Sequence, residues 1–301
     1  IVGTRGSELA LWQANATETL LRAAFPEAEI VRQVIKTTGD RRTDVALSEV
    51  AKSEGIIDKG VFIKELEIAL EAGEIDIAVH SLKDVPTVLA AQFEIPATLE
   101  RAGVRDALVS KQAGGLAALP EGARVGTSSV RRARQLQWLR PDLQILDLRG
   151  NVPTRLNKLI EADDYDAIML AEAGLVRLGY FPSSDERLFF EILEESTFYP
   201  AAGQGAIGLE IRSDDAVMRE IATAIGHSNT FLQVRAEREF LRLLDAGCHT
   251  PVGVYSHLEN DCLHMSARVF PESGGAPRLA AVSGPQNEPC KVAQQLFETL
   301  S

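Results

Sequence analysis

The chain has 301 residues, of which 45 % are hydrophobic and 25 % are charged, so it is long and apolar enough for two or three folded cores. No apolar run approaches the roughly 18 residues of a membrane helix, and the net charge of −12 argues against general nucleic-acid binding. Three cysteines (Cys248, Cys262 and Cys290) without metal-type spacing are typical of a reducing compartment. The first twenty residues show no secretory signal. We therefore expect a cytoplasmic protein without a membrane or nucleic-acid partner, and a plastid location stays open.

The first hundred residues alternate between apolar runs and segments of helical period, which is typical of an α/β sheet protein. A strand at residues 1–2 precedes a helix over residues 7–25, and a second strand is expected over 29–35. A helix over 60–70, with Gly73 as its stop, leads into a strand over 75–79. That strand runs into the segment 80–86, and ligands of open parallel sheets bind beyond such strand ends.

A second α/β block follows from about residue 105 to residue 198. Strands are expected near 106–110, 124–126, 144–148 and 167–171, with helices that begin near Ser129 and Pro153. Two further helices are expected over 214–225 and 229–244. A β-rich tail and a last helix near 292–300 complete the chain. The pattern predicts two similar α/β lobes and a smaller α+β domain.

Basic residues gather in one segment of this acidic chain. Residues 124–158 contain eight Arg and Lys against two Asp, a net charge of +6. Arg131 and Arg132 follow the expected helix cap Ser129, and Arg155 follows Pro153, so all three fall in the first turns of helices. Arg5 likewise precedes the expected cap Ser7.

These positions oppose the ordinary preference of helix N-termini for Asp or Glu, which is worth about 0.3–1 kcal/mol for each residue. Free backbone N–H groups and guanidinium groups together form a strong anion site. The segment therefore favours a ligand with many carboxylates or phosphates. The alternative is a single solvated basic face.

Two motifs have both a functional and a structural interpretation. Asp84 is the best candidate for acid–base or cation-stabilising chemistry, although an Asp beside Lys83 at a strand end is often a salt-bridged cap. His80 is expected to be a buried, hydrogen-bonded histidine rather than a base. Cys248 lies in a loop between a helix and a strand, where its thiol is expected to be exposed.

Two other patterns are expected to be structural. Residues 203–208 match the dinucleotide pattern G-x-G-x-x-G, but a loop precedes them and a strand-like run follows, so a hinge or a close backbone approach is expected. Cys262 and His264 can both bind metals, but they alternate along an expected strand in a way that needs no site, so no metal is expected.

Taken together, these segments resemble the porphobilinogen deaminase family along essentially the whole chain. The matching segments follow the family's order: residues 3–7 with 9–13, 36–40, 59–62 with 64–67, 80–86, 126–132, 149–151 with 154–156, 173–179, 203–208, and Gly247-Cys248 with Pro251. A single match would be weak, but so many in order are highly specific.

The resemblance implies a monomer of three domains: residues 1–98 with 199–213, residues 99–198, and residues 214–301. The first two domains would be lobes similar to periplasmic solute-binding proteins, with the active cleft between them. The family is a transferase of heme and other tetrapyrrole biosynthesis. It joins four porphobilinogen molecules head to tail, releasing ammonia each time, to give the linear tetrapyrrole hydroxymethylbilane.

The resemblance also implies a dipyrromethane cofactor, attached to Cys248 by a thioether. Asp84 would contact pyrrole nitrogens, protonate the departing amine and stabilise cationic intermediates. The cofactor would be held by Ser7, Lys83, Ser129, Arg131, Arg132 and Arg177. Substrate and growing chain would be held by Arg5, Thr127, Ser128, Arg149 and Arg155. A six-ring chain carries about a dozen carboxylates, which match these cationic groups.

Two other functions compete with this interpretation. Two α/β lobes with a basic cleft also suit a non-catalytic anion-binding protein of the periplasmic type. The glycine pattern alone suggests a Rossmann dehydrogenase, which should bind NAD. A covalent dipyrrole on the protein distinguishes the transferase from both.

Overall fold

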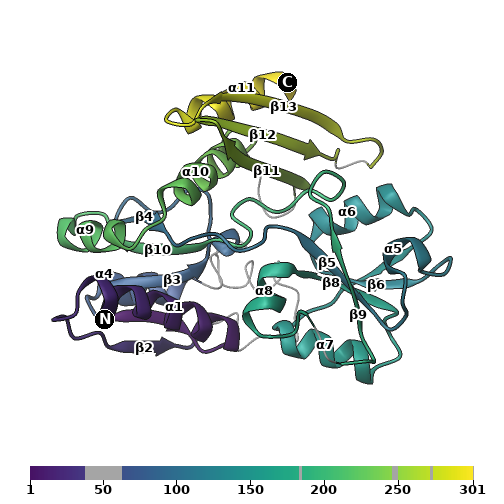
Figure 1. Ribbon diagram of the computed structural model, residues 1–301, viewed down its shortest axis with the longest axis horizontal. Coiled ribbons are helices and arrows are strands. Elements are labelled where there is room, and N and C mark those ends of the chain that lie inside the picture. Colours follow the sequence, from purple (N-terminus) through teal and green to yellow (C-terminus); the bar gives the residue numbers. More distant parts are fainter. Residues whose placement is uncertain (38–62, 183–184, 246–249, 272–273, 301) are drawn as a thin grey trace. The chain divides into compact units, whose positions relative to one another are not determined.

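The computed structural model describes residues 1–37, 63–182, 185–245, 250–271 and 274–300 (Figure 1). Its contacts divide the chain into two compact units, Ile1–Ala102 with Gly205–Arg235, and Gly103–Gln204 with Ala236–Ser301. Cys248 and the start of the helix expected from residue 60 lie outside the described residues.

The first unit is built on a five-stranded sheet with the order β2-β1-β3-β10-β4. Its strands are β1 (Val2–Arg5), β2 (Arg32–Ile35), β3 (Ile77–Ser81), β4 (Phe93–Thr98) and β10 (Ile207–Arg212). The helical segments are α1 (Glu8–Ala24), α4 (Lys64–Glu71), the short 3₁₀ turn η2 (Leu82–Asp84), α9 (Ala216–Ala224) and the first part of α10 (Ser228–Leu243). Strand β1 is parallel to β2 and β3, whereas β10 is antiparallel to β3 and β4.

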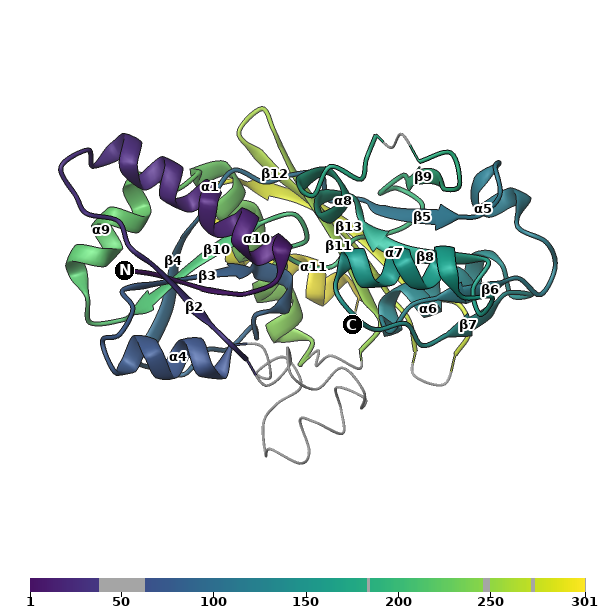
Figure 2. The same cartoon turned by 90° about the horizontal axis from the view of Figure 1, so that it is seen from below.

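Helices cover both faces of this sheet (Figure 2). Leu21 of α1 and Ala222 of α9 belong to one buried cluster with Val79 of β3. Leu66 of α4 belongs to another with Ala78. Because neighbouring side chains of a strand point to opposite faces, β3 is buried on both sides, as expected of a central strand.

The second unit contains a five-stranded sheet with the order β7-β6-β8-β5-β9. Its strands are β5 (Asp106–Ser110), β6 (Arg124–Gly126), β7 (Gln144–Leu146), β8 (Ala167–Ala171) and β9 (Phe189–Leu193), and its helices are α5 (Gly115–Ala118), α6 (Val130–Leu139), α7 (Val152–Glu161) and α8 (Glu172–Arg177). Here too two parallel pairs are followed by two antiparallel pairs. The two sheets therefore share one pattern of parallel and antiparallel pairs, although their fourth strand comes last in sequence in the first unit (β10) and first in the second (β5). The prediction of two similar α/β lobes is confirmed.

The second unit also contains a three-stranded antiparallel sheet, β11 (Val252–Glu259), β12 (Cys262–Val269) and β13 (Arg278–Pro285). The last part of α10 and the terminal helix α11 (Pro289–Leu300) cover one face, where Phe240, Val254 and Leu296 share a buried cluster. The predicted α+β tail is confirmed. The predicted three-domain boundaries stay a prediction.

Strands β4 and β9 have no counterpart in the predicted elements. Both lie at an edge of their sheet. Strand β4 contains Pro96, which weakens a strand pattern in the sequence but is tolerated where one side of the strand has no partner. Strand β4 forms by pairing with β10, and strand β9 forms by pairing with β5. The local sequence alone does not specify either strand.

Candidate functional site

The predicted residues of the first unit lie where two neighbouring parallel strands end. Arg5 is the last residue of β1, and Ser7 caps α1 by accepting a 3.4 Å hydrogen bond from the backbone N–H of Ala10. Lys83 and Asp84 form the turn η2 directly after β3, and both are partly exposed. Since β1 and β3 run in parallel, these four side chains share one edge of the sheet, where α/β proteins bind ligands.

A buried pair lies just before this turn. The Nε2 of His80 is 2.8 Å from a carboxylate oxygen of Glu210, and both side chains are almost inaccessible to solvent. This confirms His80 as a buried, hydrogen-bonded histidine. Glu67 of α4 interacts with this pair. Its burial and the negative charge of Glu210 raise the pKa of Glu67 to about 7. Glu67 is therefore about half protonated at neutral pH, which reduces its repulsion of Glu210.

In the second unit, hydrogen bonds of the backbone and of two serine side chains order the segment after β6. The backbone N–H of Thr127 donates to the carbonyl of Leu146 (2.8 Å), and the Ser128 hydroxyl donates to the carbonyl of Leu148 (2.6 Å). Ser129 caps α6 by accepting a 3.4 Å hydrogen bond from the N–H of Arg132. The predicted helix start is confirmed.

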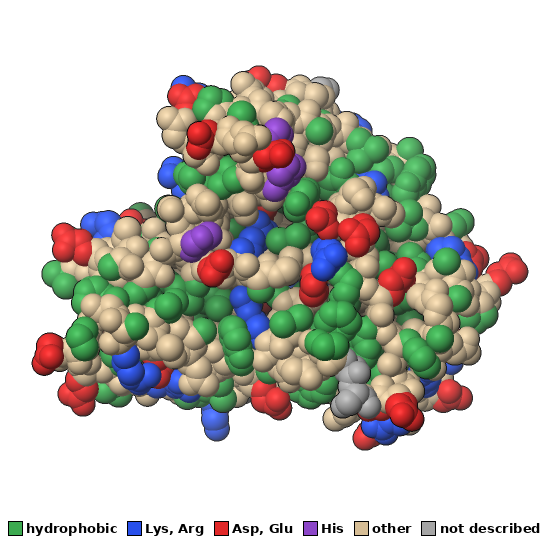
Figure 3. All heavy atoms as spheres, in the orientation of Figure 1, with side chains coloured by type: hydrophobic (Ala, Val, Ile, Leu, Met, Phe, Trp, Pro, Cys, Tyr) green, Lys and Arg blue, Asp and Glu red, His purple; other side chains and the backbone are tan. Residues whose placement is uncertain are grey.

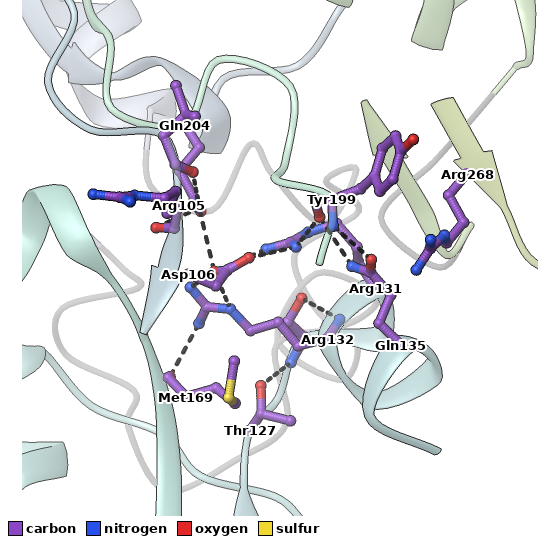
Figure 4. A network of polar contacts seen from close by, with 12 residues as sticks. Arg105, Asp106, Thr127, Arg131, Arg132, Gln135, Met169, Tyr199, Gln204 and Arg268 are labelled. Atoms are coloured by element: carbon purple, nitrogen blue, oxygen red, sulfur yellow. Dashed lines mark hydrogen bonds and ion pairs between the residues drawn. The ribbon is translucent and has the colours of Figure 1, made fainter. Parts of the chain in front are cut away.

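Arg131 and Arg132 lie in the first turn of α6, as predicted, and both are buried against Asp106 (Figure 4). Arg131 makes a forked contact with the Asp106 carboxylate at 2.6 and 3.2 Å, and Arg132 adds contacts of 2.6 and 2.8 Å. One fully buried carboxylate thus faces two guanidinium groups, which leaves a local excess of one positive charge among these three side chains.

The electrostatics of Asp106 follow from this geometry. Burial alone would raise its pKa, but the charges and hydrogen bonds of Arg131 and Arg132 outweigh burial and hold the pKa well below its usual range. Asp106 is therefore ionised at neutral pH. It anchors the first turn of α6 to the start of β5.

Replacing Asp106 with Asn is expected to destabilise the protein by about 3–5 kcal/mol near neutral pH, because two buried guanidinium groups lose their counter-charge. Since the folded-state pKa is depressed, this stabilisation is present above about pH 4 and is lost as the pH falls through the folded-state value. Chemical unfolding at pH 7 and at low pH measures it. Asp142→Asn is the control, because the Asp142–Arg140 pair is partly exposed and should matter far less. Equal losses in the two variants would contradict the anchoring role.

Three more predicted arginines follow the ends of β7 and β8. Arg149 and Arg155 flank the start of α7, where Asn151 caps the helix by accepting a 2.9 Å hydrogen bond from the N–H of Thr154. Arg177 lies in the last turn of α8, and burial lowers its pKa to about 10, which leaves it charged at neutral pH. Strands β6, β7 and β8 are parallel neighbours, so the helix starts that carry Arg131, Arg132, Arg149 and Arg155 share one edge of the sheet, and Arg177 lies at the far end of the short helix that follows β8.

Gly150, between Arg149 and α7, has a φ of 120°, and a Cβ there would lie 2.8 Å from Thr154. Any other residue would have both an unfavourable backbone conformation and a steric clash with Thr154. The backbone that leads into α7 therefore requires glycine at this position.

Several polar residues around Asp106 were not predicted from the sequence. The Gln204 amide donates to the carbonyl of Val104 (2.7 Å) and to the Asp106 carboxylate (3.2 Å). Gln135 makes two hydrogen bonds with the backbone of Tyr199, whose carbonyl also accepts from Arg131. These contacts join residues far apart in the chain, and no local signal marks them.

The glycine pattern at residues 203–208 lies where the chain passes from the second unit to the first. Gly203 and Gly205 have φ values of 71° and 83°, and the N–H of Gly203 donates to Glu237 at 2.8 Å. Strand β10 follows instead of the helix that dinucleotide binding requires. This agrees with the interpretation that rejected a nucleotide site; the hinge stays a prediction.

Comparisons with known proteins agree with the resemblance. Residues 1–220 match the family model "Porphobilinogen deaminase, dipyromethane cofactor binding domain", and residues 231–301 match "Porphobilinogen deaminase, C-terminal domain". Porphobilinogen deaminase of Syntrophobacter fumaroxidans is 42 % identical over 98 % of this chain and 92 % of its own length. That of Carboxydothermus hydrogenoformans is 44 % identical over 100 % of this chain and 93 % of its own length.

Among solved structures, the periplasmic VFT2 domain of Bordetella pertussis BvgS matches 74 % of this chain and 82 % of its own, with 13 % identity and a TM-score of 0.42. Across the part of the chain that the structure describes, none of the helices has the length and apolar character of a membrane span. Two adjoining family models and relatives matched over nearly their whole length give one answer: the chain belongs to the porphobilinogen deaminase family.

Proposed function

We propose that this protein is a hydroxymethylbilane synthase, which joins four porphobilinogen molecules head to tail and releases the linear tetrapyrrole. Membership of the porphobilinogen deaminase family supports the reaction. The structural observation that carries the proposal is the group of arginines at the helix starts that follow the parallel neighbours β6 and β7, with Arg177 on the helix that follows β8. A growing chain with two carboxylates on every ring needs such an edge.

The residues present suit a dipyrromethane cofactor. The Nη1 of Arg149, which we assign to the chain that grows on the cofactor, is buried without a hydrogen-bond acceptor among the described residues, and an acidic side arm of that chain would supply one. The Asp106 cluster has a surplus positive charge that an anion would balance. Attached to Cys248, the cofactor would supply the primer to which the first substrate is added. We assign its binding to Ser7, Lys83, Ser129, Arg131, Arg132 and Arg177.

Arg131 and Arg132 would act mainly through charge and position. Most of their donors already meet Asp106 and the carbonyls of Tyr199 and Met169. An anion near the first turn of α6 would therefore meet fixed guanidinium groups rather than mobile ones, so little side-chain entropy is lost on binding. Arg5, Thr127, Ser128, Arg149 and Arg155 are assigned to substrate and to the growing chain.

Asp84 is assigned the proton chemistry. In each condensation, the substrate's bond between carbon and the amino group breaks, and the nitrogen leaves with the bonding electrons as ammonia. A new carbon–carbon bond forms to the terminal pyrrole, whose α-carbon then loses a proton. A carboxyl group beside the pyrrole nitrogens can protonate the departing amine and, once ionised, stabilise positive charge on the ring.

The finer assignments belong to the same proposal. They are a monomer in the cytoplasm, with no nucleic-acid partner, and the domain division at residues 1–98 with 199–213, 99–198 and 214–301. The shared pairing pattern of the two five-stranded sheets supports the first two domains, and the separate sheet β11-β12-β13 supports the third.

Turnover of porphobilinogen tests the proposal. The purified protein should consume four porphobilinogen molecules and one water for each tetrapyrrole, with release of four ammonia molecules. Ammonia determination and mass spectrometry of the product measure this ratio. Binding of porphobilinogen without release of ammonia would instead support the non-catalytic anion-binding alternative. Absence of colour with Ehrlich's reagent, which detects dipyrroles, would point the same way.

A further inference from the structure

The outward face of the C-terminal sheet brings two histidines and a glutamate together. His257 of β11 and His264 of β12 are cross-strand partners, and their rings stack with centroids 4.7 Å apart. Glu259 lies two residues beyond His257 on the same face. Each of the three offers a ligand atom, and these atoms lie within 4.8 Å of one another. Figure 3 shows histidine side chains at the surface over this sheet, next to acidic ones.

The hairpin fixes this arrangement. Asn260 and Asp261 form a two-residue turn in which both have positive φ, 49° and 61°, the conformation that joins tightly paired strands. On the opposite face, Leu263 is buried in the core and Leu258 packs against that core. A shift of register by one residue would expose these leucines, so the three polar side chains are held on the outward face.

Two hydrogen-bonding details suit a metal ligand set. The Nδ1 of His264 lies 2.7 Å from the Ser283 hydroxyl, which orients the ring and leaves Nε2 for another partner. Metal-binding histidines usually have their second nitrogen fixed in this way. The Nδ1 of His257 is buried and makes no hydrogen bond within the described residues.

The surroundings favour a cation. His257 and His264 line a groove of about 470 Å³, together with the segment that follows β9. The charged side chains lining it are Glu194 and Glu195, with no Lys or Arg among the lining residues. Glu194 pairs with Arg105, whose charge also interacts with that of Glu195. One carboxylate oxygen of Glu195 is still buried without a hydrogen-bond partner among the described residues.

In contrast to the sequence-based expectation of no metal, we propose that His257, Glu259 and His264 bind a divalent first-row transition-metal ion of the zinc class. Two imidazoles and a carboxylate suit Zn²⁺, Co²⁺ or Ni²⁺ better than Mg²⁺ or Ca²⁺, which prefer all-oxygen sites. Ligand bonds of about 2.0–2.2 Å require the ligand atoms to move closer by small side-chain rotations. Water completes the coordination from the groove. The ion would tie β11 to β12 and is independent of the proposed transferase reaction.

Isothermal titration calorimetry of the 301-residue holoprotein with Zn²⁺ tests the site. We expect one Zn²⁺ per chain, and at least tenfold weaker binding in both His257→Gln and His264→Gln. Titration with Co²⁺ should give the visible absorption bands of a low-coordinate complex, and these should be missing in the variants. Zn²⁺ should also raise the Tm of the wild type but not of the variants.

Two controls separate this site from other zinc-binding groups. Cys290→Ser removes an exposed thiol, and His227→Gln removes a histidine of the first unit, so both should bind Zn²⁺ like the wild type. The metal-free Tm of the His257, His264 and Cys290 variants should stay near that of the wild type, because these side chains lie outside the core cluster. His227→Gln removes the acceptor of a hydrogen bond from the backbone N–H of Thr230 at the start of α10, so only its Zn²⁺ binding is compared. Undiminished Zn²⁺ binding by the double variant His257→Gln/His264→Gln, or equal loss in the Cys290→Ser control, would overturn the proposal.

Discussion

Asp84→Asn should lower kcat by about 10²–10⁴-fold and leave the fold and the covalent cofactor intact. The amide has nearly the shape of the carboxyl group but can neither deliver a proton to the departing amine nor carry the negative charge that stabilises the electron-poor ring. Asp84 is partly exposed at the end of η2, so the substitution removes no core packing. Steady-state ammonia release measures the rate, and intact mass measures cofactor content.

Asp147→Asn is a matched control for this experiment. Asp147 is an exposed carboxylate that follows β7 in the second unit and has no assigned role. Its replacement should leave kcat within about twofold of the wild type. Rates like those of the wild type in Asp84→Asn would contradict the assigned chemistry. A variant that folds but lacks the covalent cofactor would place Asp84 in cofactor assembly instead.

Cys248→Ser should remove the covalent cofactor and with it nearly all turnover. A hydroxyl is a far weaker nucleophile than a thiol, so no stable link to the dipyrromethane is expected. Wild-type protein made in a host that supplies porphobilinogen should be heavier than its sequence mass by one dipyrromethane. Protein with Cys248→Ser should have its sequence mass, as measured by intact mass spectrometry.

The other two cysteines provide the controls. Cys262 is partly buried in β12, and Cys290 is exposed near the start of α11. Cys262→Ser and Cys290→Ser should each retain the full adduct mass and give a colour with Ehrlich's reagent. An adduct that persists in Cys248→Ser, or that disappears in Cys290→Ser, would refute Cys248 as the attachment residue.

The starts of the principal helices could be predicted from the sequence because their signals are local. The expected caps Ser7 and Ser129 each accept a hydrogen bond from an N–H in the first turn of the following helix, and Pro153, the expected start of the next helix, lies in the first turn of α7. The placement of Arg131, Arg132 and Arg155 in those first turns follows directly from these signals. The carboxyl ends of parallel strands then indicate where these residues gather.

The contacts made by those arginines could not be predicted. Asp106 begins a strand about 25 residues before Arg131, and nothing in its neighbourhood indicates that it lies fully buried against two guanidinium groups. The same applies to His257 and His264, whose contact depends on a register set by the hairpin turn. Local periodicity specifies an element, but the pairing between elements depends on which faces the whole fold buries.

The place of β10 has a consequence for synthesis of the chain. Strands β3 and β4 follow each other in sequence yet do not pair, because β10 lies between them and arrives more than a hundred residues later. All five strands of the other large sheet, by contrast, come from residues 106–193. On the ribosome, the later sheet can therefore form completely before β10, the last strand of the earlier sheet to be synthesised, is available. Any product that stops short of residue 207 would leave β3 and β4 with unpaired edges, which invite aggregation.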